Sequence, residues 1–168
     1  MEPTPSSKVL SRPELARRSA QLRAEGRRLV LTNGCFDLLH AGHVRYLHQA
    51  RALGDALAVA LNGDASVSRL KGSGRPITPL LDRAEVLAAL ADVDYITVFD
   101  EDDASRLVTE VRPGIYVKGG DYSGDPGSAR FPPEGIAAAR AGAEVVVLPF
   151  LPGRSTTSLI QKLRTGKR

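Results

Sequence analysis

The sequence predicts an α/β protein with a single doubly wound domain, built on a five-stranded parallel sheet of strand order 3-2-1-4-5. Two observations predict it: short apolar runs alternate with helical patterns, and 168 residues suit one domain. Almost continuous apolar runs are typical of parallel strands, because helices cover both faces of such a sheet. Right-handed crossovers between the strands then give the doubly wound order.

Each element has its own local signal. A capping box with a proline at residues 11–14 predicts a helix that ends near Gly26, after a flexible tail of residues 1–10. The predicted strands are residues 29–32, 56–61, 95–99, 115–118 and 144–148. The predicted helices are residues 43–53, 79–91 (with Thr78 as N-cap), 103–111, 133–141 and 158–164, so that one domain spans residues 11–168.

The composition is that of an ordinary globular domain, with 42% apolar and 25% charged residues. No apolar run approaches the roughly 18 residues that cross a membrane, and residues 1–8 lack the apolar core of a signal peptide. A single cysteine excludes an internal disulfide framework and favours a cytoplasmic location. The net charge of +4 suits phosphorylated ligands, whereas scattered basic residues and the lack of tryptophan argue against a nucleic-acid partner.

The most informative segment is residues 33–43, Asn-Gly-Cys-Phe-Asp-Leu-Leu-His-Ala-Gly-His, which joins the first predicted strand to a helix. A helix N-terminus attracts phosphate through its unpaired N–H groups and its dipole. His40 and His43 share a helix face, and Gly42 between them leaves the backbone open to a phosphate. Such a pair also occurs as a polar helix start or in metal sites, but His48 lies off this face, so we expect no zinc site.

Three later loops also carry residues suited to phosphate. Residues 71–76, Lys-Gly-Ser-Gly-Arg-Pro, suit a loop that closes on a polyphosphate, or form a plain basic surface loop. Residues 118–122, Lys-Gly-Gly-Asp-Tyr, allow close approach of the backbone to a ligand, or form a turn. Residues 153–158 include four consecutive hydroxyl side chains, which predict an anion-binding helix start or an ordinary cap. Asp64 is expected either to bind a ribose or a metal-bound group, or to cap the next turn.

The predicted topology brings two of these segments together. Ligands of doubly wound sheets bind beyond the carboxyl ends of the strands that flank the switch point, which here are the first and fourth strands. Residues 33–43 and 118–122 follow those strands. No catalytic triad, thiol–histidine pair or carboxylate dyad stands out in the sequence. A reaction between two phosphorylated substrates needs none, because alignment and charge stabilisation suffice.

Residues 32–43 and 154–158 (Arg-Ser-Thr-Thr-Ser) resemble the cytidylyltransferase-like branch of the nucleotidyltransferase superfamily, which has a His-x-Gly-His motif and a late Ser/Thr motif. The resemblance covers about residues 28–164 and implies a Rossmann-like nucleotidyltransferase domain. Within the family, the adenylyltransferases for D-glycero-β-D-manno-heptose 1-phosphate are similar in three stretches, residues 62–72, 75–80 and 117–122. This similarity implies that AMP is transferred from ATP to the heptose phosphate, which gives pyrophosphate and ADP-heptose for lipopolysaccharide inner-core synthesis. It also implies a stand-alone form of the enzyme, without a fused sugar kinase.

The resemblance implies a role for each matching residue. His40, His43 and Lys71 are expected to be catalytic, and the sugar phosphate is expected to contact Asp37, Asp121 and Tyr122. The nucleotide is expected to bind Asn33, Gly34, Phe36, Gly42, Asp64, Arg83, Lys118, Gly119, Gly120, Arg154, Ser155, Thr156 and Thr157. Mg²⁺ is expected on the ATP oxygens without dedicated protein ligands. We also expect a homodimer, with no membrane or nucleic-acid partner.

One departure from the family narrows the substrates. Glycerol-3-phosphate cytidylyltransferases typically carry Arg-Thr-Glu-Gly-Ile before the late motif, where this chain has Leu-Pro-Gly-Arg at residues 151–154. The difference argues against CTP with glycerol 3-phosphate, and Arg154 is expected to replace the missing arginine. Three alternatives to the heptose-phosphate adenylyltransferase remain. They are a glycerol-3-phosphate cytidylyltransferase, an adenylyltransferase for another sugar or flavin phosphate, and a non-catalytic module that binds nucleotides or nucleic acid.

Overall fold

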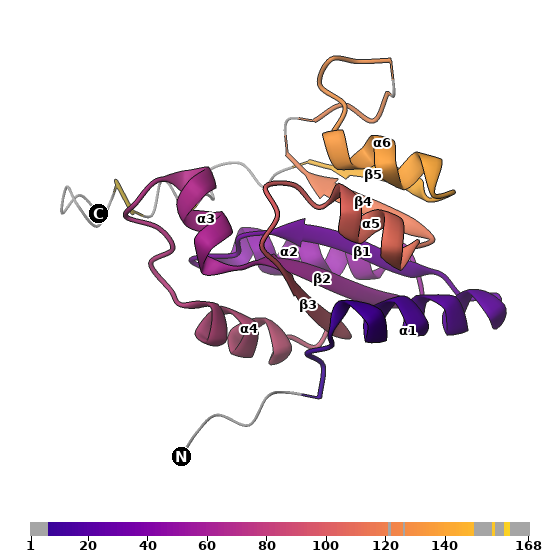
Figure 1. Ribbon diagram of the computed structural model, residues 1–168, viewed down its shortest axis with the longest axis horizontal. Helices are drawn as coiled ribbons and strands as arrows, with labels where there is room; N and C mark the ends of the chain where they lie inside the picture. The colour runs from indigo at the N-terminus through magenta and orange to yellow at the C-terminus, as the bar shows by residue number, and fades with distance from the viewer. Residues whose placement is uncertain (1–6, 121, 126, 150–155, 157–159, 162–168) are drawn as a thin grey trace.

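The computed structural model describes residues 7–120, 122–125, 127–149, 156, 160 and 161, and it has the predicted α/β architecture (Figure 1). Its sheet is entirely parallel, with the order β3-β2-β1-β4-β5. The strands are β1 (Leu29–Gly34), β2 (Ala56–Asn62), β3 (Tyr95–Phe99), β4 (Ile115–Gly119) and β5 (Glu144–Leu148). The helices are α1 (Arg12–Ala24), α2 (Ala41–Arg51), α3 (Asp64–Lys71), α4 (Leu80–Ala88), α5 (Ser105–Val111) and α6 (Pro133–Arg140). The structure therefore confirms the fold class and the strand order.

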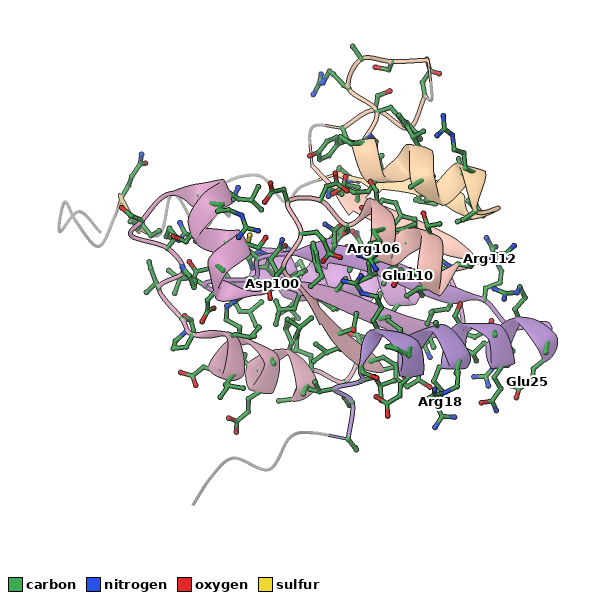
Figure 2. The ribbon with its side chains drawn as sticks, in the orientation of Figure 1. Arg18, Glu25, Asp100, Arg106, Glu110 and Arg112 are labelled. Carbon is green, nitrogen blue, oxygen red and sulfur yellow. The ribbon has the colours of Figure 1, made fainter. Side chains whose placement is uncertain are left out.

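Helices cover both faces of the sheet, with α1, α5 and α6 on one face and α2 and α4 on the other (Figure 1). At the surface, Arg12 of α1 pairs with Glu101 at 2.8 Å and with Glu110 of α5 at 3.4 Å. Glu110 also pairs with Arg106 one turn earlier on α5 (Figure 2). None of the described helices is long and apolar enough to span a membrane.

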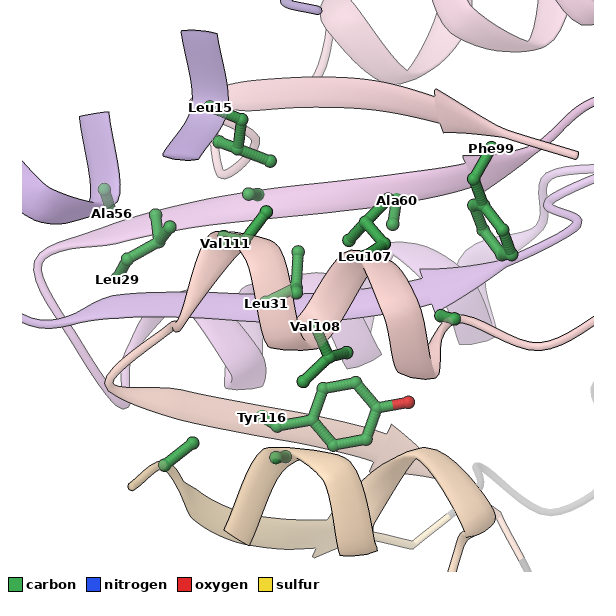
Figure 3. Packing of buried hydrophobic residues seen from close by; sticks show 14 of the residues in the cluster. Leu15, Leu29, Leu31, Ala56, Ala60, Phe99, Leu107, Val108, Val111 and Tyr116 are labelled. Carbon is green, nitrogen blue, oxygen red and sulfur yellow. The ribbon is translucent and has the colours of Figure 1, made fainter. Parts of the chain in front are cut away.

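Side-chain alternation along β2 explains the two cores. Ala56, Ala58 and Ala60 face the layer of α1 and α5, where Leu15 and Leu107 pack against the sheet (Figure 3). The larger residues between them, leucine and valine, belong to the second core with α2 and α4. Every residue of β2 is buried, as its almost continuous apolar run predicts.

Most predicted boundaries lie within a few residues of the observed ones. The capping box is present at α1, where the Ser11 N–H donates to the Glu14 carboxylate at 2.8 Å. The predicted tail is attached to the sheet at its end, because the Leu10 N–H donates to the carbonyl of Ile96 at 2.8 Å. Residues 1–6 and most of the predicted helix 158–164 lie outside the described residues.

Two helix predictions need correction. Helix α3 is absent from the predictions because it is short and largely polar, with only Ser66 and Val67 buried. Thr78 is not the N-cap of α4; Pro79 holds that position without a side-chain hydrogen bond. The N–H of Thr78 donates instead to the carboxylate of Asp37 at 2.8 Å.

Candidate active site

The carboxyl edge of the sheet opens between β1 and β4. These two strands pair with each other only as far as Thr32 and Val117. Beyond that point β1 stays paired with β2 as far as Gly34, and β4 stays paired with β5 as far as Gly119. The two strands therefore diverge at the switch point, which is where doubly wound sheets bind their ligands.

The loop after β1 turns tightly into α2. Phe36 is buried and has a φ of 44°, in the left-handed region. Its ring packs against Gly34, where an added Cβ would lie 3.0 Å from a ring carbon. His40 is the N-cap of α2, and its Nδ1 accepts the N–H of Gly42 at 3.1 Å. Helix α2 thus begins two residues before His43, so that His40 is its N-cap and His43 lies in its first turn.

The two histidines are in direct contact. The rings of His40 and His43 stack with centroids 3.9 Å apart, and the ring of Phe36 lies 5.3 Å from His43. Burial, with a smaller contribution from His40, lowers the pKa of His43 to about 4. The Nδ1 atom of His43 is buried and has no hydrogen-bond partner among the described residues. At neutral pH His43 is therefore an uncharged imidazole with an unsatisfied polar atom, a state common at functional sites.

Thr156, the one described residue of the late hydroxyl segment, lies beside this loop. The hydroxyl of Thr156 donates to the carbonyl oxygen of Leu38 at 3.4 Å, although the two residues are 118 positions apart in the sequence. The fold therefore brings Thr156 against the first motif. Four predicted site residues, Asp121, Arg154, Ser155 and Thr157, lie outside the described part of the chain.

A largely buried polar cluster links β1 and β4 beyond the point where their backbones pair. The Lys118 ammonium donates to Oδ1 of Asn33 at 3.1 Å and to Oε1 of Glu134 at 2.8 Å. The Tyr116 hydroxyl donates to the same Asn33 oxygen at 2.6 Å. Only 14% of the Lys118 side chain and 8% of the Glu134 side chain are exposed. The ring of Tyr122 lies 5.6 Å from the ammonium, so the predicted Asn33, Lys118 and Tyr122 come together here.

The glycines after β4 shape the end of this cluster. Gly119 is the last residue of β4, and Gly120 follows with a φ of 120°, which favours glycine. The N–H of Gly120 donates to the carbonyl of Leu148 at 3.1 Å, which directs the chain toward β5. Tyr122, just beyond, is exposed.

Asp37 fixes the loop between α3 and α4. Its carboxylate accepts the N–H groups of Ile77 and Thr78, each at 2.8 Å, and pairs with the guanidinium of Arg75. Burial alone would raise the pKa of Asp37, but these donors together hold it below its usual value. The side chain is 1% exposed, so its described contacts are all internal.

Arg83 links several backbone segments around the loop between α3 and α4. Its fully buried guanidinium donates to the carbonyl oxygens of Cys35 at 2.6 Å, Asn62 at 2.9 Å and Thr78 at 3.0 Å. It also pairs with Asp64, the first residue of α3, at 2.6 Å. Asp64 and Arg83 are therefore brought together, and they join the loop after β1 to the starts of α3 and α4.

Lys71 ends α3 as an exposed side chain close to the first loop. Burial raises the pKa of the Cys35 thiol, although the positive charges of Lys71 and Arg83 oppose the shift. Cys35 is therefore a protonated thiol at neutral pH, not a thiolate nucleophile. The described residues also contain no group of three or more His, Cys, Asp or Glu side chains that could hold a metal ion.

Sequence reasoning missed Glu134 and Tyr116, which complete the cluster around Lys118. Glu134 follows two prolines at the start of α6, where an acidic residue is ordinary because it complements the helix dipole. Tyr116 belongs to a buried strand and reads as core. Only the spatial meeting of β1, β4 and α6 distinguishes these two residues from structural ones.

Comparison with known proteins gives consistent matches. The family described as cytidylyltransferase-like matches residues 31–150. The chain is 51% identical over 162 residues to the bifunctional protein HldE of Alkalilimnicola ehrlichii, and 52% identical over 150 residues to that of Streptomyces coelicolor. These matches cover 94% and 89% of this chain but 32% and 31% of those proteins, so the chain spans about a third of the length of its curated relatives.

Solved structures give a similar result. The lipopolysaccharide core biosynthesis protein of Thermoplasma volcanium matches with a TM-score of 0.57 and 29% identity, over 75% of this chain and 98% of that one. A pantoate-β-alanine ligase of Francisella tularensis matches with a TM-score of 0.56 over 89% of this chain and 68% of that one. The ligase is 11% identical and so supports the fold alone.

Proposed function

Because the chain belongs to the cytidylyltransferase-like family of nucleotidyltransferases, we propose that it transfers AMP from ATP to D-glycero-β-D-manno-heptose 1-phosphate. The products are ADP-heptose and pyrophosphate, and the ADP-heptose serves lipopolysaccharide core synthesis. A solved relative at 29% identity is named for lipopolysaccharide core biosynthesis, and curated relatives at about half identity span most of this chain. The heptose itself rests on the similarity of residues 62–72, 75–80 and 117–122.

The contact between Thr156 and the Leu38 carbonyl carries the proposal. It brings a hydroxyl of the late motif to the loop that leads into α2, two residues before His40. A triphosphate bound there lies between two groups of donors, the N-terminus of α2 and the hydroxyl segment. Residues 154–157 are proposed to hold the β- and γ-phosphates from the second side.

The proposed reaction needs no covalent intermediate on the protein. An oxygen of the sugar 1-phosphate attacks the α-phosphorus of ATP. The new P–O bond forms while the bond to the α,β-bridging oxygen breaks, and pyrophosphate leaves with that electron pair. No proton has to move, because the attacking oxygen is already anionic. Catalysis is therefore alignment of the two phosphates and stabilisation of the charge that builds at phosphorus.

The described residues supply both effects. His43, uncharged and partly desolvated, donates a hydrogen bond to the reacting phosphate, and His40 packs against it and caps α2. The exposed Lys71 is proposed to close on the leaving pyrophosphate. Lys118 is proposed to bind a phosphate oxygen at the opening between β1 and β4.

The nucleotide is proposed to enter as its Mg²⁺ complex. Its phosphate oxygens are proposed to supply most of the metal ligands. We also propose that the chain acts in the cytoplasm as a homodimer. Its single cysteine suits a reducing compartment. The exposed Leu81 near the start of α4 offers an apolar side chain for self-association, which light scattering can test.

Pyrophosphate release tests the reaction. ATP and CTP are each combined with D-glycero-β-D-manno-heptose 1-phosphate and with glycerol 3-phosphate, in the presence of Mg²⁺. We expect release only with ATP and the heptose phosphate. Release with CTP and glycerol 3-phosphate would overturn the substrate assignment, and no release with any pair would overturn the proposed activity.

A further inference from the structure

We propose that Glu134 is a positioning residue that holds the Lys118 ammonium so that one N–H points to a phosphate oxygen of a reactant. This role depends on the proposed reaction, but it concerns a residue that none of the sequence motifs contains. The carboxylate reaches Lys118 from α6, whereas Lys118 and Asn33 come from β4 and β1. Three separate elements therefore meet at one ammonium group.

The number of donors on Lys118 leaves one for a ligand. A lysine ammonium has three N–H groups and no acceptor. One donates to Asn33 at 3.1 Å and a second to Glu134 at 2.8 Å. Lys118 has no further hydrogen-bond acceptor among the described residues; the ring of Tyr122 lies 5.6 Å from the ammonium, and the charge of Lys118 also acts on the carboxylate of Asp103. With two N–H groups fixed, the direction of the third is fixed as well.

The cluster also sets the position of Lys118 where the sheet no longer does. Beyond Thr32 and Val117 the backbones of β1 and β4 are not paired, so side chains link the two strands. Asn33 is itself held at both ends, since its Oδ1 accepts from Tyr116 at 2.6 Å and its Nδ2 donates to Glu134 at 3.3 Å. Glu134 thus contacts both residues that line the opening.

Charge compensation explains why the holder is a carboxylate. Lys118 and Glu134 are both largely buried, and a buried ammonium without a partner is strongly unfavourable. The pair is neutral as a whole, so an incoming phosphate is attracted by a directed N–H rather than by net charge. Loss of Glu134 would remove the fixed direction of the Lys118 ammonium.

The phosphate can come from either reactant, and kinetics distinguish the two. The variants are Glu134→Ala, Glu134→Gln, Lys118→Ala and the double variant, with Glu144→Gln on the exposed start of β5 as control. KM is measured for ATP and for the sugar phosphate separately, with the other substrate saturating. We expect Glu134→Ala to raise one of the two KM values about tenfold or more, with a smaller change in kcat. The KM that rises identifies the phosphate that Lys118 binds.

The energetic coupling between Glu134 and Lys118 distinguishes a positioning role of Glu134 from general structural support. In the Lys118→Ala background, Glu134→Ala should change the same KM less than about twofold, because its effect passes through Lys118. Glu134→Gln keeps the shape and one acceptor oxygen, and should recover part of the loss. If Glu134→Ala does not fold, Glu134→Gln carries the test with an expected rise of about threefold to tenfold.

Two results would overturn the role of Glu134. One is unchanged KM values for both substrates in folded Glu134 variants. The other is an effect of equal size with and without Lys118. If the wild-type protein turns over no substrate pair, the proposed function fails, and calorimetric binding of ATP and of the heptose phosphate replaces the kinetics. The role then stands only if Glu134→Ala weakens binding of one ligand about tenfold, and it falls if both affinities are unchanged or wild type binds neither ligand.

Discussion

The two sides of the loop after β1 handle their polar groups differently. On the side of α3 and α4, Arg83 and Asp37 are almost fully buried, and each is bound to three or more internal partners. On the side of α2 and β4, the Nδ1 of His43 has no partner among the described residues. There too, Lys118 uses two of its three N–H groups within the described part of the chain.

This difference distinguishes residues that stabilise the fold from residues that bind the reactants. A buried charge with a full set of hydrogen bonds fixes the backbone around it, and it has little left to offer a ligand. A buried polar atom without a partner is costly unless a ligand satisfies it. We therefore assign the Arg83–Asp37 side to the scaffold and the His43–Lys118 side to the reactants. Asp37, Asp64 and Arg83 were predicted to contact substrates. Those contacts stay predictions, and the kinetics of an Asp37 variant test one of them.

The largest expected effect is the loss of Arg83. Arg83→Met leaves three backbone carbonyls without their donor and the Asp64 carboxylate without its ion-pair partner. We expect the free energy of unfolding to fall by about 3–5 kcal/mol in urea titrations. Arg106→Met removes an exposed ion pair on α5 and should cost about 0.5 kcal/mol. Similar losses of unfolding free energy in the two variants would contradict the assignment of Arg83 to the scaffold.

On the other side of the loop, His43→Ala should lower activity rather than stability. It removes a hydrogen-bond donor to the reacting phosphate, and such donors contribute about 100- to 1,000-fold to kcat. We expect a loss of that size in pyrophosphate release, with the circular dichroism spectrum unchanged. His48→Ala is the matched control, because His48 is 72% exposed and pairs with Asp92. Activity near the wild-type level in His43→Ala would contradict the catalytic assignment.

The low pKa of His43 predicts a pH dependence of stability. Its pKa is about 4 in the folded protein and 6.5 in an exposed histidine. Between these pH values the unfolded chain binds more protons than the folded protein. The stability that depends on a neutral His43 is therefore fully present above pH 6.5 and is lost as the pH falls toward 4. The contribution is about 3 kcal/mol, and it should be missing from His43→Ala. Parallel pH curves for the two proteins in urea titrations would show that His43 is not desolvated.

Much of this arrangement could be predicted from the sequence. Apolar runs located the strands because every residue of β2 is buried, and the crevice followed from the strand order. The His-x-Gly-His spacing placed His40 and His43 together because residues three apart share a helix face. These features depend on local periodicity and topology, which a single sequence contains.

The partners of individual charges could not be predicted in the same way. Arg83 resembled a nucleotide contact, yet its described partners are the Asp64 carboxylate and carbonyls from two loops and the end of β2. Glu134 resembled an ordinary helix start, yet it pairs with Lys118 from another element. Both outcomes depend on which elements meet in space at a scale of about 3 Å. Helix α3 escaped prediction because too few of its residues are buried to give a helical period.

The smallest expected effect distinguishes the two roles of Asp37. Asp37→Asn keeps an acceptor for the N–H groups of Ile77 and Thr78 but places an amide N–H toward Arg75. If Asp37 only anchors this loop, stability should fall by about 1–2 kcal/mol, and the KM for the sugar phosphate should change little. Urea titration and steady-state kinetics on the same preparation measure both quantities. A KM that rises tenfold or more at unchanged stability would move Asp37 from the scaffold to the reactants, because only a direct ligand contact separates the two readouts in that direction.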